Sequence, residues 1–171
     1  RDNPQSSNDD HWLEQHGIVE KKPAVQAVRE AVAVVRYLLA GGTGGYSGEI
    51  FHLSQTVPAP YPIPESPVPV MIGTWGRQMC ALAGEIADEV KVGGSANPAL
   101  VPVIQSYIAV GERLVGRRVG TTSVVMGAVT VVDEDGAQAR AVARRAVALY
   151  LPVVASLDPT LEVDPELIER L

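Results

Sequence analysis

The chain has 171 residues, 46% of them hydrophobic and 5% aromatic, so it can bury a core built mainly from aliphatic side chains. Its net charge of -6, without a basic cluster, argues against nucleic acid and anionic membranes as partners. No apolar run approaches the roughly 20 residues of a membrane span and no signal pattern opens the chain, so we expect a cytoplasmic protein.

The first forty residues predict two helices. Residues 1–20 combine a polar loop with a short helix, which residues 8–10 can cap. Residues 22–40 predict a longer helix, because Pro23 suits the first helical position and apolar residues then recur at three- and four-residue intervals until Gly41. The chain begins with Arg1 instead of Met, so we expect it to be a piece of a longer protein.

Residues 44–67 predict an extended, proline-rich arm. Tyr46, Ile50 and Phe51 flank Gly48 in its first part. Between Val57 and Pro69, six prolines exclude a helix and any central strand, so this part is expected to cross the surface in an extended form. A proline-rich recognition segment is the alternative.

Residues 68–151 predict three consecutive βα units. In the first, residues 68–72 form a buried strand, residues 73–76 a turn, and residues 79–86 have helical spacing. A second strand follows Asp88 and Glu89 and ends at residues 93–95. Two strands joined by one such helix are parallel, as in doubly wound sheets and (β/α) barrels. Ligands are therefore expected at the carboxyl ends of these strands.

The remaining units have clear boundaries in the sequence. Asn97 and Pro98 predict the start of a helix that ends at Gly116. Residues 121–132 predict a strand and residues 137–151 a helix, which Pro152 should kink or end. Residues 152–171 form a C-terminal segment in which one more helix begins at residue 165.

Two glycine-rich loops form the candidate binding site, because a helix that begins after a strand presents free amides and a positive dipole end to a phosphate. The two loops supply Gly73, Thr74, Gly76 and Arg77, and then Gly94 and Ser95. A plain tight turn, or for the second loop a turn with an N-cap, stays the alternative.

Other candidate residues have simpler roles. Trp75 either packs on the next loop or stacks on a ligand. Asp88 is expected to have a structural role at the head of its strand, and the single cysteine, Cys80, to be a buried structural thiol. The three histidines are expected to be surface or packing residues. No metal-binding motif, nucleophile elbow or Walker sequence is present, so no metal is expected.

Several of these strings are similar to a known family. The Leu-Ala-Gly-Glu-Ile-Ala-Asp string at residues 82–88, the Gly-Thr-Trp-Gly turn and Gly-Glu-Ile-Phe at residues 48–51 resemble the luciferase-like oxidoreductases. The closest resemblance is to their F420-dependent branch, which includes methylenetetrahydromethanopterin reductase, and it covers residues 12–151. It implies a (β/α)8 barrel that binds a flavin or the deazaflavin F420 at its carboxyl face.

By this resemblance, the three strands correspond to the family's fifth to seventh, so the fold class is α/β, a partial (β/α)8 TIM barrel. The family's cofactor phosphate tail would contact Gly73, Thr74, Trp75, Gly76, Arg77, Gln78, Gly94 and Ser95. Many members have Gly-Pro-Lys where this chain has Gly-Arg-Gln at residues 76–78. Strands one to four would precede Arg1, so the chain alone is expected to aggregate or to bind cofactor weakly, and to be inactive.

The implied function is hydride transfer between coenzyme F420 and an unidentified small organic substrate. An FMN-dependent monooxygenase of the same superfamily is one alternative. A non-catalytic, barrel-derived binding protein is the other, which the change at Arg77 and Gln78 favours. No catalytic residue is assigned, and a homodimer stays open because family barrels are often dimers.

Overall fold

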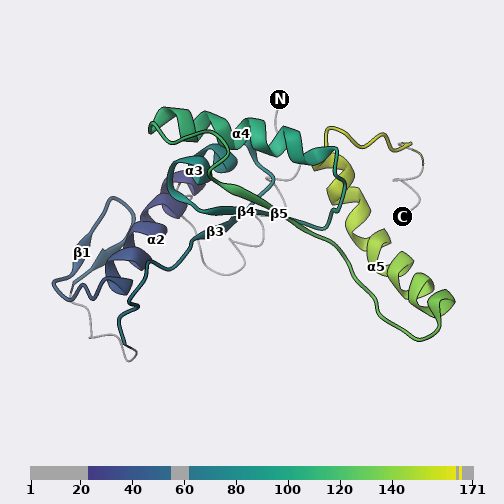
Figure 1. The fold of residues 1–171 in the computed structure, drawn as a ribbon, viewed down its shortest axis with the longest axis horizontal. Coiled ribbons are helices and arrows are strands. Elements are labelled where there is room, and N and C mark those ends of the chain that lie inside the picture. Colours follow the sequence, from purple (N-terminus) through teal and green to yellow (C-terminus); the bar gives the residue numbers. More distant parts are fainter. Residues whose placement is uncertain (1–22, 55–61, 165, 167–171) are drawn as a thin grey trace. The chain divides into compact units, whose positions relative to one another are not determined.

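The computed structural model describes residues 23–54, 62–164 and 166 (Figure 1). The predicted helix within residues 1–20, part of the proline-rich arm and the helix start at residue 165 lie outside the described residues. The chain divides between Glu65 and Ser66 into two compact units. Within the described part, no helix combines the length and the apolar character that crossing a membrane requires.

The first unit contains one helix and one short hairpin. Helix α2, Ala24–Leu39, is followed by Gly41, whose φ of 80° suits glycine just after a helix C-terminus. Strands β1, Tyr46–Ser47, and β2, His52–Leu53, pair antiparallel. The helix confirms its prediction, whereas the hairpin corrects the extended arm predicted for this segment. Two-residue strands are too short for an alternating pattern to reveal them.

Glu30 of α2 fixes the hairpin turn. Its side chain is 6% exposed, and its carboxylate accepts hydrogen bonds from the amides of Glu49, Ile50 and Phe51 at 2.9, 2.8 and 3.0 Å. Burial alone would raise the pKa of Glu30, but these hydrogen bonds stabilise the charged form and the pKa is lowered. The turn therefore depends on a residue far upstream in the sequence.

The second unit is built around a parallel sheet with the strand order β3-β4-β5. Its elements in chain order are β3 Met71–Gly73, α3 Arg77–Ile86, β4 Glu89–Gly93, α4 Leu100–Leu114, β5 Ser123–Gly127 and α5 Gly136–Leu157. The predicted alternation of strands and helices and the predicted parallel pairing are both confirmed.

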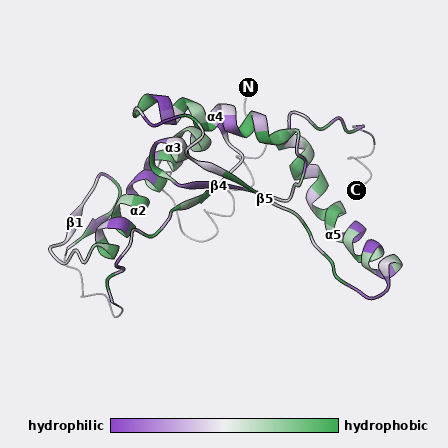
Figure 2. Cartoon of the chain, viewed as in Figure 1, coloured by the Kyte–Doolittle hydropathy of each residue, from purple (hydrophilic) through white to green (hydrophobic). Residues whose placement is uncertain are grey.

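Helices α3 and α4 lie on the same side of this sheet (Figure 1). Val90 and Val92 of β4 are 0% exposed, and the alternate positions of the strand point to the other face. The two helices add Cys80, Leu82, Ala83, Leu100, Ile104 and Ile108 to the core. Each fully buried Leu or Ile stabilises the fold by about 1.5–3 kcal/mol. Figure 2 shows hydrophobic and hydrophilic residues on both helices, as expected for helices that cover a sheet.

Cys80 and Asp88 have the structural roles predicted for them. Cys80 is fully buried, and burial raises the pKa of its thiol to about 11. Asp88 accepts a hydrogen bond from the Val70 amide at 2.8 Å, and its own amide donates to the Val70 carbonyl at 2.9 Å. These bonds join the segments that lead into β3 and β4.

Three predicted boundaries were wrong. Strand β3 begins at Met71 instead of residue 68, and Met71 is 46% exposed, so this strand is buried on one face only and not throughout as predicted. Strand β5 ends at Gly127 instead of residue 132, because Gly127 pairs with the last residue of β4 and the chain turns at Gly94, where φ is 83°. Helix α5 continues past Pro152 to Leu157. Proline removes one hydrogen-bond donor from a helix, but residues beyond it, such as the buried Val154, still pack against the unit.

Candidate cofactor site

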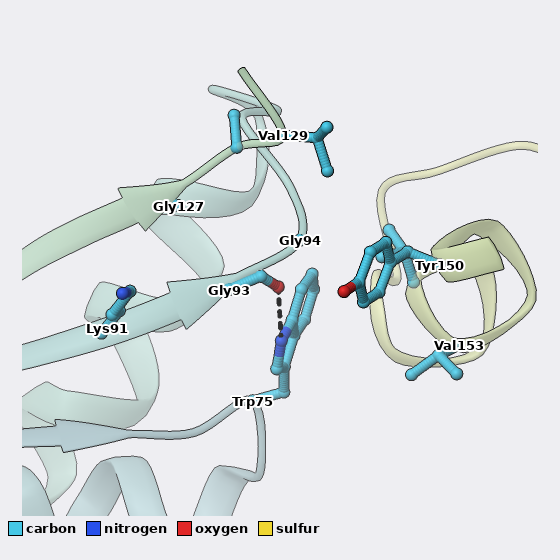
Figure 3. Close-up of a pocket in the computed structure, with 10 residues that line it drawn as sticks. Trp75, Lys91, Gly93, Gly94, Gly127, Val129, Tyr150 and Val153 are labelled. Carbon is cyan, nitrogen blue, oxygen red and sulfur yellow. Dashed lines mark hydrogen bonds between the residues drawn. The ribbon is translucent and has the colours of Figure 1, made fainter. Parts of the chain in front are cut away.

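The loops after β3 and β4 meet at the carboxyl edge of the sheet. The Thr74 amide donates to the Lys91 carbonyl at 3.0 Å. The Trp75 indole Nε1–H donates to the Gly93 carbonyl at 3.1 Å (Figure 3). Trp75 therefore packs on the second loop, which is one of the two roles predicted for it.

A cavity of about 380 Å³ opens beside Trp75. This volume lies within the range of small-molecule sites, roughly 300–1,000 Å³. Three strand ends and one helix line it, with Trp75, Lys91, Gly93, Gly94, Gly127, Ala128, Val129, Tyr150, Val153 and Val154. Figure 3 shows the Tyr150 side chain facing the indole of Trp75. Of the predicted site residues, Trp75 and Gly94 line the cavity, and Gly93 belongs to the loop predicted after the second strand. Sequence reasoning missed the remaining lining residues.

Glycines leave the backbone bare at this edge. A Cβ at Gly73 or Gly93 would meet no atom within 4 Å. Gly94 has a φ of 83°, which a side chain would strain. A ring or a phosphate can thus approach the main chain closely, so the residues present fit a nucleotide-like group.

The first loop uses some of its hydrogen-bonding groups internally. The Gly76 amide donates to Thr74 Oγ1 at 3.0 Å, and the Thr74 amide is bonded to β4. Helix α3 has no side-chain cap, and no described residue accepts from the amides of Arg77 and Gln78. The groups that these bonds leave for a ligand include the amides of Arg77 and Gln78 and the proton of the Thr74 hydroxyl.

Arg77 and Ser95 do not line the cavity. The Arg77 guanidinium lies 5.8 Å from the centre of the Tyr107 ring, a cation–π distance, so its side chain is turned toward α4. Ser95 is 8% exposed, and its Oγ accepts from the Asn97 amide at 3.1 Å. Gly73, Thr74, Gly76 and Gln78 also lie outside the lining.

A polar cluster joins the second loop to the end of α5. Asn97 Nδ2 donates to Asp158 Oδ2 at 3.0 Å and to Thr160 Oγ1 at 2.9 Å. Asp158 is 3% exposed; burial would raise its pKa, but hydrogen bonds from Thr160 and Asn97 lower it. Because α5 supplies Tyr150 and Val154 to the cavity, the cluster positions one wall of the site.

We expect Asn97→Ala to lower the free energy of unfolding by roughly 1–3 kcal/mol, because the buried Asp158 carboxylate loses a donor. Urea unfolding followed by circular dichroism measures the change. The control is Gln105→Ala, an exposed position on α4 that should change the value by less than about 0.5 kcal/mol. Equal stability of the two variants would contradict the role of the cluster.

Of the three histidines, His52 is the one that lies within the described residues. His52 is exposed on the hairpin, where Nδ1 lies 3.4 Å from Ser47 Oγ. No group of three or more His, Cys, Asp or Glu side chains in the described ranges is arranged to hold a metal ion.

Comparison with known proteins shows the family of the chain. The family model described as luciferase-like monooxygenase matches residues 6–165. The chain is 33% identical over 149 residues to 5,10-methylenetetrahydromethanopterin reductase of Archaeoglobus fulgidus, covering 87% of this chain and 42% of the relative. With the same reductase of Methanolobus tindarius it shares 30% identity over 152 residues, covering 87% of the chain and 44% of the relative.

Two solved structures share the fold. The coenzyme F420-dependent tetrahydromethanopterin reductase from Methanopyrus kandleri matches with a TM-score of 0.64 and 24% identity, over 88% of this chain and 41% of that one. An F420-dependent secondary alcohol dehydrogenase in complex with an F420-acetone adduct matches with a TM-score of 0.58 and 24% identity, over 90% and 47%. The chain thus spans less than half the length of these proteins. Because the family model covers most of its residues, the chain belongs to the luciferase-like monooxygenase family.

Proposed function

We propose that the chain supplies part of the cofactor site of an F420-dependent oxidoreductase. The observation that carries this proposal is the cavity at the carboxyl edge of the parallel sheet, beside Trp75 and the bare backbone of Gly93 and Gly94. The names of the relatives support it, since the matched structures are F420-dependent enzymes. We propose with it that the three strands belong to a (β/α)8 barrel whose carboxyl face carries the site.

The chain's own residues would bind and orient the cofactor. The amides of Arg77 and Gln78 and the Thr74 hydroxyl would donate to the phosphate at the start of α3. Gly94 and Ser95 would border the same group from the second loop. When bound, the deazaflavin supplies the hydride exchange with a small organic substrate. We propose that the enzyme works in the cytoplasm as a homodimer. Light scattering of the full-length protein would test the dimer.

Titration of the full-length protein with F420 and with FMN tests this function. We expect saturable binding of F420, followed by absorbance or fluorescence, and a change in the F420 redox state in the presence of substrate. Binding of FMN without F420 would support an FMN-dependent monooxygenase instead. Binding of neither would support a non-catalytic member of the family.

The phosphate loop has its own test. We expect Thr74→Val to weaken F420 binding about tenfold, because the variant keeps the shape of the side chain but loses a hydroxyl that would donate to a charged oxygen and that accepts from the Gly76 amide. Thr74→Ser keeps the hydroxyl and should bind like the unchanged protein. Isothermal titration of both variants compares them directly, and equal affinities would remove Thr74 from the site.

A further inference from the structure

Lys91 places a positive charge in the wall of the cavity (Figure 3). It lies on β4 between Val90 and Val92, which are both buried on the helix side of the sheet. Since side chains alternate along a strand, Lys91 belongs to the opposite face, which α3 and α4 leave uncovered. This is the face that carries the candidate site.

The neighbours of Lys91 provide space and no charge. In the sheet register, Lys91 lies between Gly73 of β3 and Val125 of β5. On the same face, the next pair toward the carboxyl edge is Gly93 and Gly127, neither of which has a side chain. Lys91 Cε lies 3.3 Å from the point that a Cβ on Gly127 would occupy. The lysine stem thus fills room that a larger residue at Gly127 would take.

The Lys91 ammonium is also unpaired within the described structure. No described residue makes a hydrogen bond or an ion pair with it. Glu89 is an acidic residue on the same face of β4, two residues toward its amino end. Lys91 is exposed in the described structure. In the closed barrel that we propose, the ammonium would be enclosed and would require a negative partner, because burying an unpaired charge is costly.

We propose that Lys91 recognises a negatively charged oxygen of the bound cofactor. This inference rests on the proposed function and names a residue that the resemblance did not assign. The oxygen belongs either to the phosphate-bearing tail or to an acidic group on the ring. Both sources share one chemistry, a charge-assisted hydrogen bond from an ammonium.

The test compares two lysine variants and two probes in the full-length protein. Lys91→Met keeps an unbranched side chain and removes the charge, while Lys91→Arg keeps the charge. Fluorescence titration with F420 should show a loss of affinity of about tenfold or more for Lys91→Met, and near-normal affinity for Lys91→Arg. The second probe is the same deazaflavin without its phosphate-bearing tail. An equal loss for both probes locates the oxygen on the ring, and a loss for F420 alone locates it on the phosphate.

Glu89→Gln is the matched control for an internal ion pair. If Lys91 only neutralises Glu89, Lys91→Met and Glu89→Gln will both lower the melting temperature, and neither will change F420 affinity. That result overturns the inference and leaves the proposed function standing. Failure of the unchanged protein to bind F420 would overturn the proposed function itself. Lys91→Gln gives the same comparison if the methionine variant folds poorly.

Discussion

Gly111→Ala is expected to lower the free energy of unfolding by about 3 kcal/mol or more, which is the upper end of the usual cost of overpacking. A Cβ at Gly111 would overlap the Ala81 carbonyl oxygen and lie 2.7 Å from its carbon and 3.0 Å from the Glu85 amide nitrogen. These are main-chain atoms of α3, so no side-chain rotation relieves the overlap. The two helices would have to move apart.

Gly84 makes the reciprocal contact from α3. A Cβ there would overlap the Ile108 carbonyl oxygen and lie 3.0 Å from the Glu112 amide nitrogen. We therefore expect Gly84→Ala to be similarly destabilising. The two changes should not be additive, since both separate the same pair of helices.

Urea unfolding followed by circular dichroism checks these values. The matched control is Gly73→Ala, because its Cβ would meet no atom within 4 Å and its φ is not positive. Its unfolding free energy should change by less than about 0.5 kcal/mol. A Gly111→Ala variant as stable as Gly73→Ala would show that the backbones of α3 and α4 are not in contact.

The order of elements could be predicted because each element carries its own local signal. The apolar spacing of α3 and the Asn97-Pro98 start before α4 require no knowledge of distant residues. The end of β5 could not be predicted, because it depends on where the neighbouring strand β4 ends. The hairpin turn depends in the same way on Glu30, which is far from it in sequence.

The residues of the candidate site also differ in whether a local sequence signal predicts them. Trp75 and Gly94 follow strand ends, and the sequence alone predicts that such loops share one edge of a parallel sheet. Lys91 carried a usable signal, since it stands between two valines in a short strand. No sequence signal pointed to Tyr150, because its position depends on the Asn97–Asp158 hydrogen bond near the end of α5. Arg77 was predicted to contact the phosphate because it lies in the first turn of α3, but its side chain is turned toward Tyr107 of α4.

Glu112 is the position where we expect the second large effect on stability. It is 1% exposed on α4, and its carboxylate accepts from the amides of Gly120 and Thr122, each at 2.8 Å. These bonds hold the connection that leads into β5. In Glu112→Gln, one amide keeps an acceptor and the other faces an NH2 group, so we expect a loss of roughly 1–3 kcal/mol. Glu112→Ala leaves both amides unpaired and adds a cavity, so its loss should be larger.

The pH dependence of stability separates the charge of Glu112 from its shape. Burial would raise the pKa of Glu112, but the hydrogen bonds from Thr122 and Gly120 lower it below the ordinary value of 4.5. Because the pKa of Glu112 is lower in the folded state than in the unfolded state, its ionisation stabilises the fold at pH values above the ordinary pKa. This stability is lost as the pH falls through the folded-state pKa.

Urea unfolding at several pH values between about 7 and 3 measures this contribution in the unchanged protein and in Glu112→Gln. Asp158 and Glu30 also have lowered pKa values, so both proteins will lose stability in acid. The difference between them isolates Glu112, and we expect it to shrink as the pH falls below the ordinary value. A difference that stays constant would mean that the carboxylate acts by its shape, and that its charge does not hold the loop before β5.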